Sequence, residues 1–185
     1  MILPIVAFGS SVLRKKAVDI TKDYKDIDLL ISNMIETMHN ANGVGLAAPQ
    51  INKSIRLFII DTTPFAADED VDFKICKKVF INPEIIKEDG DEWIFNEGCL
   101  SIPNIREDVI RKSIITIKYL DANFTWQQNT YEGLTARVIQ HEYDHINGIL
   151  FTDNISPLRK RMLKSKLLNI SKGKIDVSYK MSLYS

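Results

Sequence analysis

The segment that most constrains this fold runs from Ala136 to Phe151 and reads ARVIQHEYDHINGILF. It places His141 and His145 four residues apart, with a glutamate directly after the first. Positions four apart lie on one face of an α-helix with Cβ atoms about 5–6 Å apart, so both imidazoles can reach one metal ion at roughly 2.0–2.1 Å. Leu134 and Val138 precede the histidines on the same face, so we expect this face to point into the protein.

Glu142 lies beside the histidine face, where its carboxylate can reach a metal-bound water as a general base. A HExxH string also occurs by chance in helices that bind no metal, and both histidines are then ordinary core or surface residues. The choice between these interpretations depends on whether the rest of the sequence supplies a third ligand.

Two familiar ways of completing such a site do not fit this sequence. A third histidine would stand three residues after Gly148, but that position is Phe151. A glutamate on a later helix is the other common solution, and no glutamate follows Glu142. The remaining candidates are Asp153 and Asp176 downstream, and His39, Cys76, Cys99 and several carboxylates upstream.

Cys99 is the strongest of these candidates by residue chemistry. It lies in NEGCLSIP, where Gly98 allows a close backbone approach and Pro103 ends the segment, as in turns that carry functional sites. His39 lies at the end of a helical stretch, where an exposed histidine interacts favourably with the helix dipole. Cys76 lies in FKICKKVF, where a small buried hydrophobic residue is the simpler interpretation.

Composition limits the kinds of partner that we expect. The chain has 185 residues, 45% of them hydrophobic, which suits one packed domain, 1–185. Basic and acidic residues number 24 each, so no overall charge attracts DNA or an anionic membrane. No apolar run approaches the length of a membrane span, and the N-terminal segment lacks the charge order of a signal peptide. With two cysteines, we expect free thiols and a cytoplasmic location.

Helical and alternating patterns occupy separate parts of the sequence. The stretch 23–43 carries a helical apolar stripe that ends near Gly43, and Ser156 and Pro157 begin a last helix that ends near Gly173. The histidine helix ends before Gly148. Strands are expected at 54–61, 77–86, 91–103, within 107–133 and at 174–180, with a loop at 62–76. The pattern predicts an α+β fold, with antiparallel or mixed sheets around the central HExxH helix and a C-terminal helix.

Three blocks, in this order, resemble the peptide deformylase family: GVGLAAPQ at 43–50, EGCLS at 97–101 and QHEYDH at 140–145. The segments ILPIVAFGSSVLRK and FINPEI add to the resemblance, which extends over most of the chain. Enzymes of this family remove the formyl group from the N-terminal methionine of new proteins in bacteria and organelles. Each block alone is moderately specific, whereas the three in order are highly specific.

The resemblance implies that Cys99, His141 and His145 bind one divalent metal ion, typically Fe²⁺, with Zn²⁺, Ni²⁺ or Co²⁺ able to replace it. A thiolate and two neutral imidazoles leave a fourth tetrahedral position for water, as in catalytic metal sites. A thiolate on ferrous iron is prone to oxidation, which agrees with a reducing compartment.

The resemblance also implies the catalytic roles. Water activated by the metal attacks the formyl carbon, while Glu142 holds its proton and then passes it to the leaving amine. The side-chain amide of Gln50 and the backbone N–H of Leu100 would stabilise charge on the formyl oxygen. Glu97 would orient a metal-bound histidine.

For the substrate, the resemblance implies that the Val44 and Gly45 backbone pairs with the formyl-methionyl peptide as an added strand. Gly43, Gly45 and Ala48 also match a dinucleotide-binding pattern, and either glycine is equally explained by backbone freedom. The dinucleotide pattern is out of context here, because it follows a helix and runs into a proline.

The methionine side chain needs an apolar pocket, which we expect Leu134, Val138 and Phe95 to line, although core packing explains each of them equally well. Gly98, beside the expected cysteine ligand, is placed with these substrate-binding residues. Arg106 matches a family arginine near the peptide, or is a solvated charge.

Nascent formyl-methionyl peptides are the implied substrate. The basic residues of 159–166 are either a solvated face or a transient contact with the ribosome, as in some relatives. Two other functional hypotheses remain. The chain is a zinc endopeptidase, or it is a non-enzymatic protein whose structural zinc has Cys76 as its fourth ligand. The loop 62–74 is longer than a compact deformylase needs, and the tail 174–185 need not follow the family.

Overall fold

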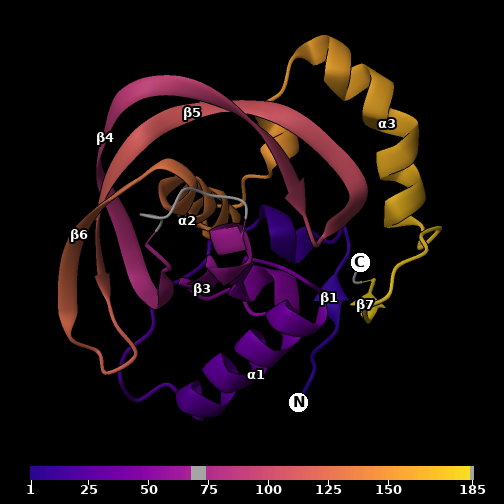
Figure 1. The fold of residues 1–185 in the computed structure, drawn as a ribbon. Coiled ribbons are helices and arrows are strands. Elements are labelled where there is room, and N and C mark those ends of the chain that lie inside the picture. Colours follow the sequence, from indigo (N-terminus) through magenta and orange to yellow (C-terminus); the bar gives the residue numbers. More distant parts are fainter. Residues whose placement is uncertain (68–73, 184–185) are drawn as a thin grey trace.

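The computed structural model describes residues 1–67 and 74–183 and has an α+β fold, as the sequence predicts (Figure 1). None of the helices in these two ranges is long and apolar enough to cross a membrane. The helices are α1 (Ile27–Asn40), α2 (Gly133–Ile146) and α3 (Pro157–Ser171). The strands are β1 (Ile5–Val6), β2 (Gly45–Ala47), β3 (Leu57–Asp61), β4 (Lys77–Cys99), β5 (Ile102–Leu120), β6 (Trp126–Glu132) and β7 (Met181–Ser182).

Five strands form one antiparallel sheet in the order β2-β3-β4-β5-β6, whereas β1 and β7 pair in parallel in a separate sheet. The 23-residue strand β4 joins the strand predicted at 77–86 to most of the one predicted at 91–103, whose last two residues already belong to β5. Its pairing with β5 shifts register at four places. Such bulges add twist and let a long hairpin curl. In Figure 1, β4, β5 and β6 accordingly curl around α2.

Helix α2 lies at the centre of the fold and packs against β2, β3, β5 and β6. Ala136, Ile139 and Ile146 are completely buried in a hydrophobic cluster with side chains of the sheet. The helix ends as predicted, and Gly148 follows it at φ +75°. A Cβ on Gly148 would lie 2.7 Å from the carbonyl oxygen of Arg14, so both conformation and packing require glycine.

Helix α1 packs beside β2 and β3 and buries Met34 and Met38. It ends near Gly43, as predicted, but the left-handed residue is Asn42, at φ +53°. The N–H groups of Asn42 and Gly43 donate to the carbonyls of His39 (3.0 Å) and Met38 (2.9 Å), which satisfies the last turn.

Helix α3 begins as predicted, because the Ser156 hydroxyl accepts from the Arg159 N–H at 3.3 Å and Pro157 occupies the first turn. Leu163 and Ile170 are its buried residues. In Figure 1, the helix lies along the outside of the β4–β5 hairpin.

The predicted strand at 174–180 is wrong. Half-buried and exposed residues do alternate there, which explains the prediction, but strand pairing begins only at Met181, opposite Ile5. Alternation shows only which side chains face the protein interior. A strand must also form backbone hydrogen bonds with a neighbouring strand, and β1, the strand next to the tail, is only two residues long.

The segment 62–76, predicted as a loop, contains a short 3₁₀ turn at Thr63–Ala67. Residues 68–73 lie outside the described residues. The part of this prediction that falls on them therefore stays a prediction.

Candidate metal centre and active site

Three side chains suited to metal binding converge between α2 and the end of β4. The sulfur of Cys99 and a ring nitrogen from each of His141 and His145 lie within 4.8 Å of one another, and Cys99 Sγ is 3.2 Å from His145 Nε2. Metal–ligand bonds of about 2.0–2.3 Å place tetrahedral ligands roughly 3.3–3.7 Å apart. The donor set and its spacing therefore fit a divalent cation.

None of the other described residues considered as third ligands joins this cluster. Within residues 1–67 and 74–183, the Cys99 group is the one cluster of three such side chains. The Cys76 side chain is buried in a hydrophobic cluster, as predicted. His39 is half-exposed in the last turn of α1, and its Nε2 is 2.9 Å from Asp61 Oδ2. The structure thus gives no support to a zinc site closed by Cys76.

The buried carboxylate of Glu97 orients His141. Glu97 Oε2 is 2.9 Å from His141 Nδ1, which leaves Nε2 for the ligand cluster. Arg111 binds both carboxylate oxygens, at 2.7 and 3.1 Å, and Arg137 Nη1 is 2.9 Å from Oε1. Burial opposes the charged carboxylate, but hydrogen bonds from His141 and Arg111 hold the pKa of Glu97 well below its usual range.

Three residues of this network were not predicted from the sequence: Arg111, Arg137 and Asp144. Arg111 Nη1 also bonds Asp144 Oδ2 at 2.7 Å, so one guanidinium on β5 ties Glu97 to α2. Arg137 is buried, and its guanidinium lies 4.6 Å from the ring centre of Trp93. A sequence signal for Arg137 does exist, because it lies one turn before His141 on the inward face of the helix.

Glu142 is a buried carboxylate whose Oε2 has no hydrogen-bond partner among the described residues. Burial raises its pKa to about 7. A Cβ on Gly45 would lie 2.4 Å from Glu142 Oε1, and one on Gly43 would lie 2.8 Å from Leu100 Cδ1. Neither glycine has a left-handed φ, so backbone freedom does not explain them. Close packing explains Gly45, whereas a Cβ on Gly43 would meet mainly the end of the Leu100 side chain.

The side-chain amide of Gln50 has a fixed orientation. Its Oε1 accepts from the Ala47 N–H at 2.8 Å. Because a backbone N–H can only donate, the amide NH₂ faces the other way, with Nε2 3.5 Å from Cys99 Sγ and 3.3 Å from Ser101 Oγ. Gln50 therefore directs N–H donors toward the ligand cluster.

A cavity of about 800 Å³ opens beside the cluster. His145 is fully buried and is not among the residues that line the cavity. Leu134 is half-buried in the first turn of α2, one turn farther from His141 than Val138. It does not line the cavity, so the structure gives no support to Leu134 as a pocket residue. The predicted site residues that line the cavity are Val44, Gly45, Gln50, Phe95, Glu97, Gly98, Cys99, Leu100, Arg106, Val138, His141 and Glu142.

Two further features complete the cavity. Arg106 is exposed, and its Nε is 3.0 Å from Asn96 Oδ1. Residues 176–179 of the C-terminal tail also line it, although no sequence motif predicts this.

The model of the polypeptide deformylase family matches residues 2–161. The chain belongs to this family. The peptide deformylases of Christiangramia forsetii and Flavobacterium johnsoniae are 61% and 56% identical to it over 187 residues, covering 98% of this chain and 95% of each relative. The crystal structure of the Legionella pneumophila peptide deformylase has 39% sequence identity and a TM-score of 0.81, covering 94% of this chain and 98% of that one.

The chain is therefore a metal-dependent hydrolase that removes the formyl group from the N-terminal formyl-methionine of newly made polypeptides, as peptide deformylases do. This deformylase also has the α+β fold of the solved members of its family. These matches favour a deformylase over the zinc endopeptidase that the sequence also left possible.

Proposed function

We propose that Cys99, His141 and His145 hold the catalytic divalent cation of this deformylase, and that Glu142 carries the proton. The convergence of the three ligand atoms beside a buried carboxylate at the wall of a large cavity carries this proposal. A divalent cation bound there supplies Lewis acidity, which activates water and polarises the formyl carbonyl.

Glu142 accepts the proton of the attacking water and delivers it to the leaving amine. Its Oε2, which has no hydrogen-bond partner among the residues described, is available for this proton, and its burial excludes competing solvent. Gly45 leaves the room that the carboxylate occupies. The leaving group is the amino group of the N-terminal methionine.

Gln50 and the backbone N–H of Leu100 donate to the oxygen on which charge develops. The bond from Ala47 holds the Gln50 amide in the donating orientation before the substrate arrives. Donors held in advance stabilise a transition state without reorganisation, and removing one typically costs about 10²–10³ in kcat.

The peptide is bound as an extra strand along β2. This strand is at the edge of the five-stranded sheet, and its residue Gly45 and the preceding Val44 line the cavity. Phe95 and Val138 form the apolar wall for the methionine side chain. Gly98 lets the chain approach closely, and Arg106 lies near the later residues of the peptide.

We propose Fe²⁺ as the metal in the cell, with Zn²⁺, Ni²⁺ or Co²⁺ as substitutes, and the cytoplasm as the location. A thiolate ligand on ferrous iron favours a reducing compartment. Residues 1–185 are proposed to form one catalytic domain, since the site draws on β2, β4, α2 and the tail together. Because basic and acidic residues are equal in number, we propose a peptide, and not DNA, as the partner.

A transient ribosome contact is proposed for the exposed basic side chains of α3. Two of the five basic residues are already engaged, because Arg159 binds the Glu107 carboxylate and Lys160 binds the Asp153 carbonyl. The exposed residues left for a contact are Arg161, Lys164 and Lys166. Unchanged ribosome co-sedimentation after replacement of these three by serine would remove the proposal.

The catalytic assignment is tested with anaerobically purified protein, by measuring bound metal and formate release from formyl-Met-Ala beside an internal-bond peptide. The wild type is expected to deformylate only. Glu142→Gln is expected to keep its metal and lose activity by at least about 10³-fold, because the proton carrier is gone.

Glu132→Gln is the matched control, since Glu132 is exposed and directly precedes the same helix. It is expected to keep full activity. Full activity in Glu142→Gln would refute the proton-carrier role.

A further inference from the structure

The turn that bears Cys99, Leu100 and Ser101 is held from several sides. The Ser101 carbonyl accepts from the Phe8 N–H at 2.8 Å, and the Ser101 hydroxyl is 3.3 Å from Gln50 Nε2. The third contact comes from the C-terminal tail, where the hydroxyl of Tyr179 donates to the carbonyl oxygen of Leu100 at 2.7 Å. This contact has no place in the function proposed above.

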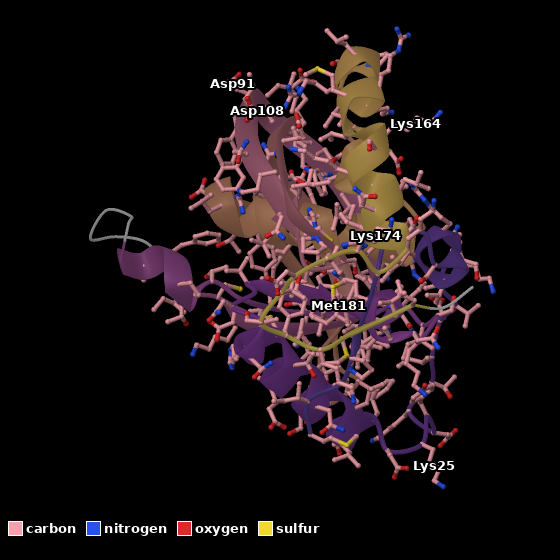
Figure 2. All side chains as sticks on the ribbon, turned by 90° about the vertical axis from the view of Figure 1, so that its right-hand side faces the viewer. Lys25, Asp91, Asp108, Lys164, Lys174 and Met181 are labelled. Atoms are coloured by element: carbon pink, nitrogen blue, oxygen red, sulfur yellow. The ribbon has the colours of Figure 1, made fainter. Side chains whose placement is uncertain are left out.

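The tail that brings Tyr179 to this turn is itself anchored at both ends. The Ile5 N–H donates to the Lys180 carbonyl at 2.8 Å, directly after Tyr179. Before it, Asn104 Nδ2 bonds the Asp176 carbonyl at 3.3 Å. Figure 2 shows the segment between the labels Lys174 and Met181 running across the molecule in that view. The segment is therefore a fixed wall of the cavity, which Asp176 and Tyr179 line.

The tyrosine ring is also packed in place. Tyr179 and Leu100 both contact the same buried cluster, to which α1, β2 and β3 contribute. Burial raises the pKa of Tyr179 to about 12, so the phenol keeps its proton at neutral pH and acts as a donor. The family model matches residues 2–161 and does not extend to this tail.

We infer that Tyr179 is a positioning residue that holds Leu100 so that its backbone N–H meets the formyl oxygen. The bond to the Leu100 carbonyl fixes the plane of the peptide that follows Leu100, and so limits rotation of this residue about its Cα. A misplaced donor weakens stabilisation of the transition state more than binding of the ground state. The inference rests on the proposed role of Leu100 in deformylation.

The test compares Tyr179→Phe with Tyr24→Phe. Tyr24 is a matched control, because its ring packs against the same cluster while its hydroxyl makes no hydrogen bond within the described residues. Both proteins are loaded with the same metal and assayed with formyl-Met-Ala, and exchange of the Leu100 amide hydrogen is followed by NMR.

We expect Tyr179→Phe to lower kcat about 5–20-fold, less than complete loss of a donor, and to leave KM within about twofold. The Leu100 amide should exchange at least about tenfold faster, while amides in the centre of β5 stay unchanged. Tyr24→Phe should match the wild type in all three measurements. Unchanged kcat, an equal loss in Tyr24→Phe, or a rise in KM in place of a fall in kcat would overturn the inference.

The two proposals fail in different ways. No formate release by the wild type would refute the proposed function, and Leu100 amide exchange would then still show whether Tyr179 holds the turn. An active wild type with an equally active Tyr179→Phe would refute only the role of Tyr179.

Discussion

Helix α2 and the turn at 99–101 meet at one site, but their residues are positioned in different ways. The helix sets the spacing of His141 and His145 by its own backbone, and their ring centres are 5.1 Å apart. The turn is held by contacts from Phe8, Gln50 and Tyr179, which are far from it in sequence. A ligand on a helix thus depends first on local structure, whereas a ligand on a turn depends on the whole fold.

The largest expected effect comes from the ligand on the turn. Cys99→Ser replaces a thiolate by a hydroxyl, which stays protonated at neutral pH and is a poor ligand for these metals. We expect metal affinity to fall at least about 100-fold and deformylation to become undetectable. Metal analysis after dialysis is the measurement, with buried Cys76→Ser as the control that keeps its metal. Stoichiometric metal in Cys99→Ser would contradict the proposed ligand set.

The second prediction breaks the link between helix and sheet. Arg111→Met leaves the charges of Glu97 and Asp144 without their shared partner, which costs about 3–5 kcal/mol in the free energy of unfolding. Metal affinity should also fall about 10–100-fold, because Glu97 no longer holds His141 as firmly. Urea unfolding and competitive metal titration measure both effects.

Lys112→Met is the control for this change, because Lys112 is the next residue on β5 and its ion pair with Glu92 is exposed. Lys112→Met should change the free energy of unfolding by no more than about 0.5 kcal/mol. If Arg111→Met lowers the free energy of unfolding by less than about 1 kcal/mol, the network does not tie α2 to the sheet.

The third prediction concerns the space between β2 and α2. Gly45→Ala places a methyl group against the Glu142 carboxylate and must displace it. We expect kcat to fall about 10–100-fold with the metal retained, because small displacements of a catalytic group are costly. Steady-state kinetics and metal analysis decide this, and a variant with wild-type kcat would show that Glu142 needs no such close approach.

The smallest effect lies away from both regions, at Asp61, the last residue of β3, which contacts His39 of α1. Burial opposes its charge, but hydrogen bonds from Thr63, His39 and Lys77 lower its pKa to about 2. Since the folded-state pKa lies below the usual value of 3.8, its stabilisation is complete above about pH 5 and is lost as pH falls toward 2. Asp61→Asn should lower the free energy of unfolding by about 1–2 kcal/mol at pH 7. The variant's stability should also fall less steeply than that of the wild type as the pH is lowered.

Urea unfolding between pH 2.5 and 7 measures this contribution. Deformylation at pH 7 is expected to stay within about twofold of the wild type, because Asp61 does not line the cavity. An acid dependence identical to that of the wild type would contradict the role of Asp61.

The features predicted best are those with a local cause. The cap at Ser156, the end of α2 before Gly148 and the helical face of the histidines follow from a few neighbouring residues, and the structure confirms all three. Wrong predictions concern pairing. The alternation at 174–180 is real, but these residues pair with no strand among the described residues. Strand β4 joins the strand expected at 77–86 to most of the one expected at 91–103.

The candidate site shows the same division. The sequence motifs predict that Cys99, Gln50 and Glu142 lie together, and these residues do line one cavity. Leu134 shares the helical stripe but stays outside, because a stripe does not show where the cavity ends. Arg111 and Tyr179 have no motif, since each matters through a partner far away in the sequence.

The sequence by itself determined which chemistry is present: two imidazoles and a carboxylate on one helix, and a thiol in a glycine-containing turn. The tertiary structure decided how these groups are held, through Arg111 between Glu97 and Asp144 and through Tyr179 on Leu100. The physical reason is that helix spacing and capping act over a few residues, whereas buried hydrogen bonds form between segments that only folding brings together.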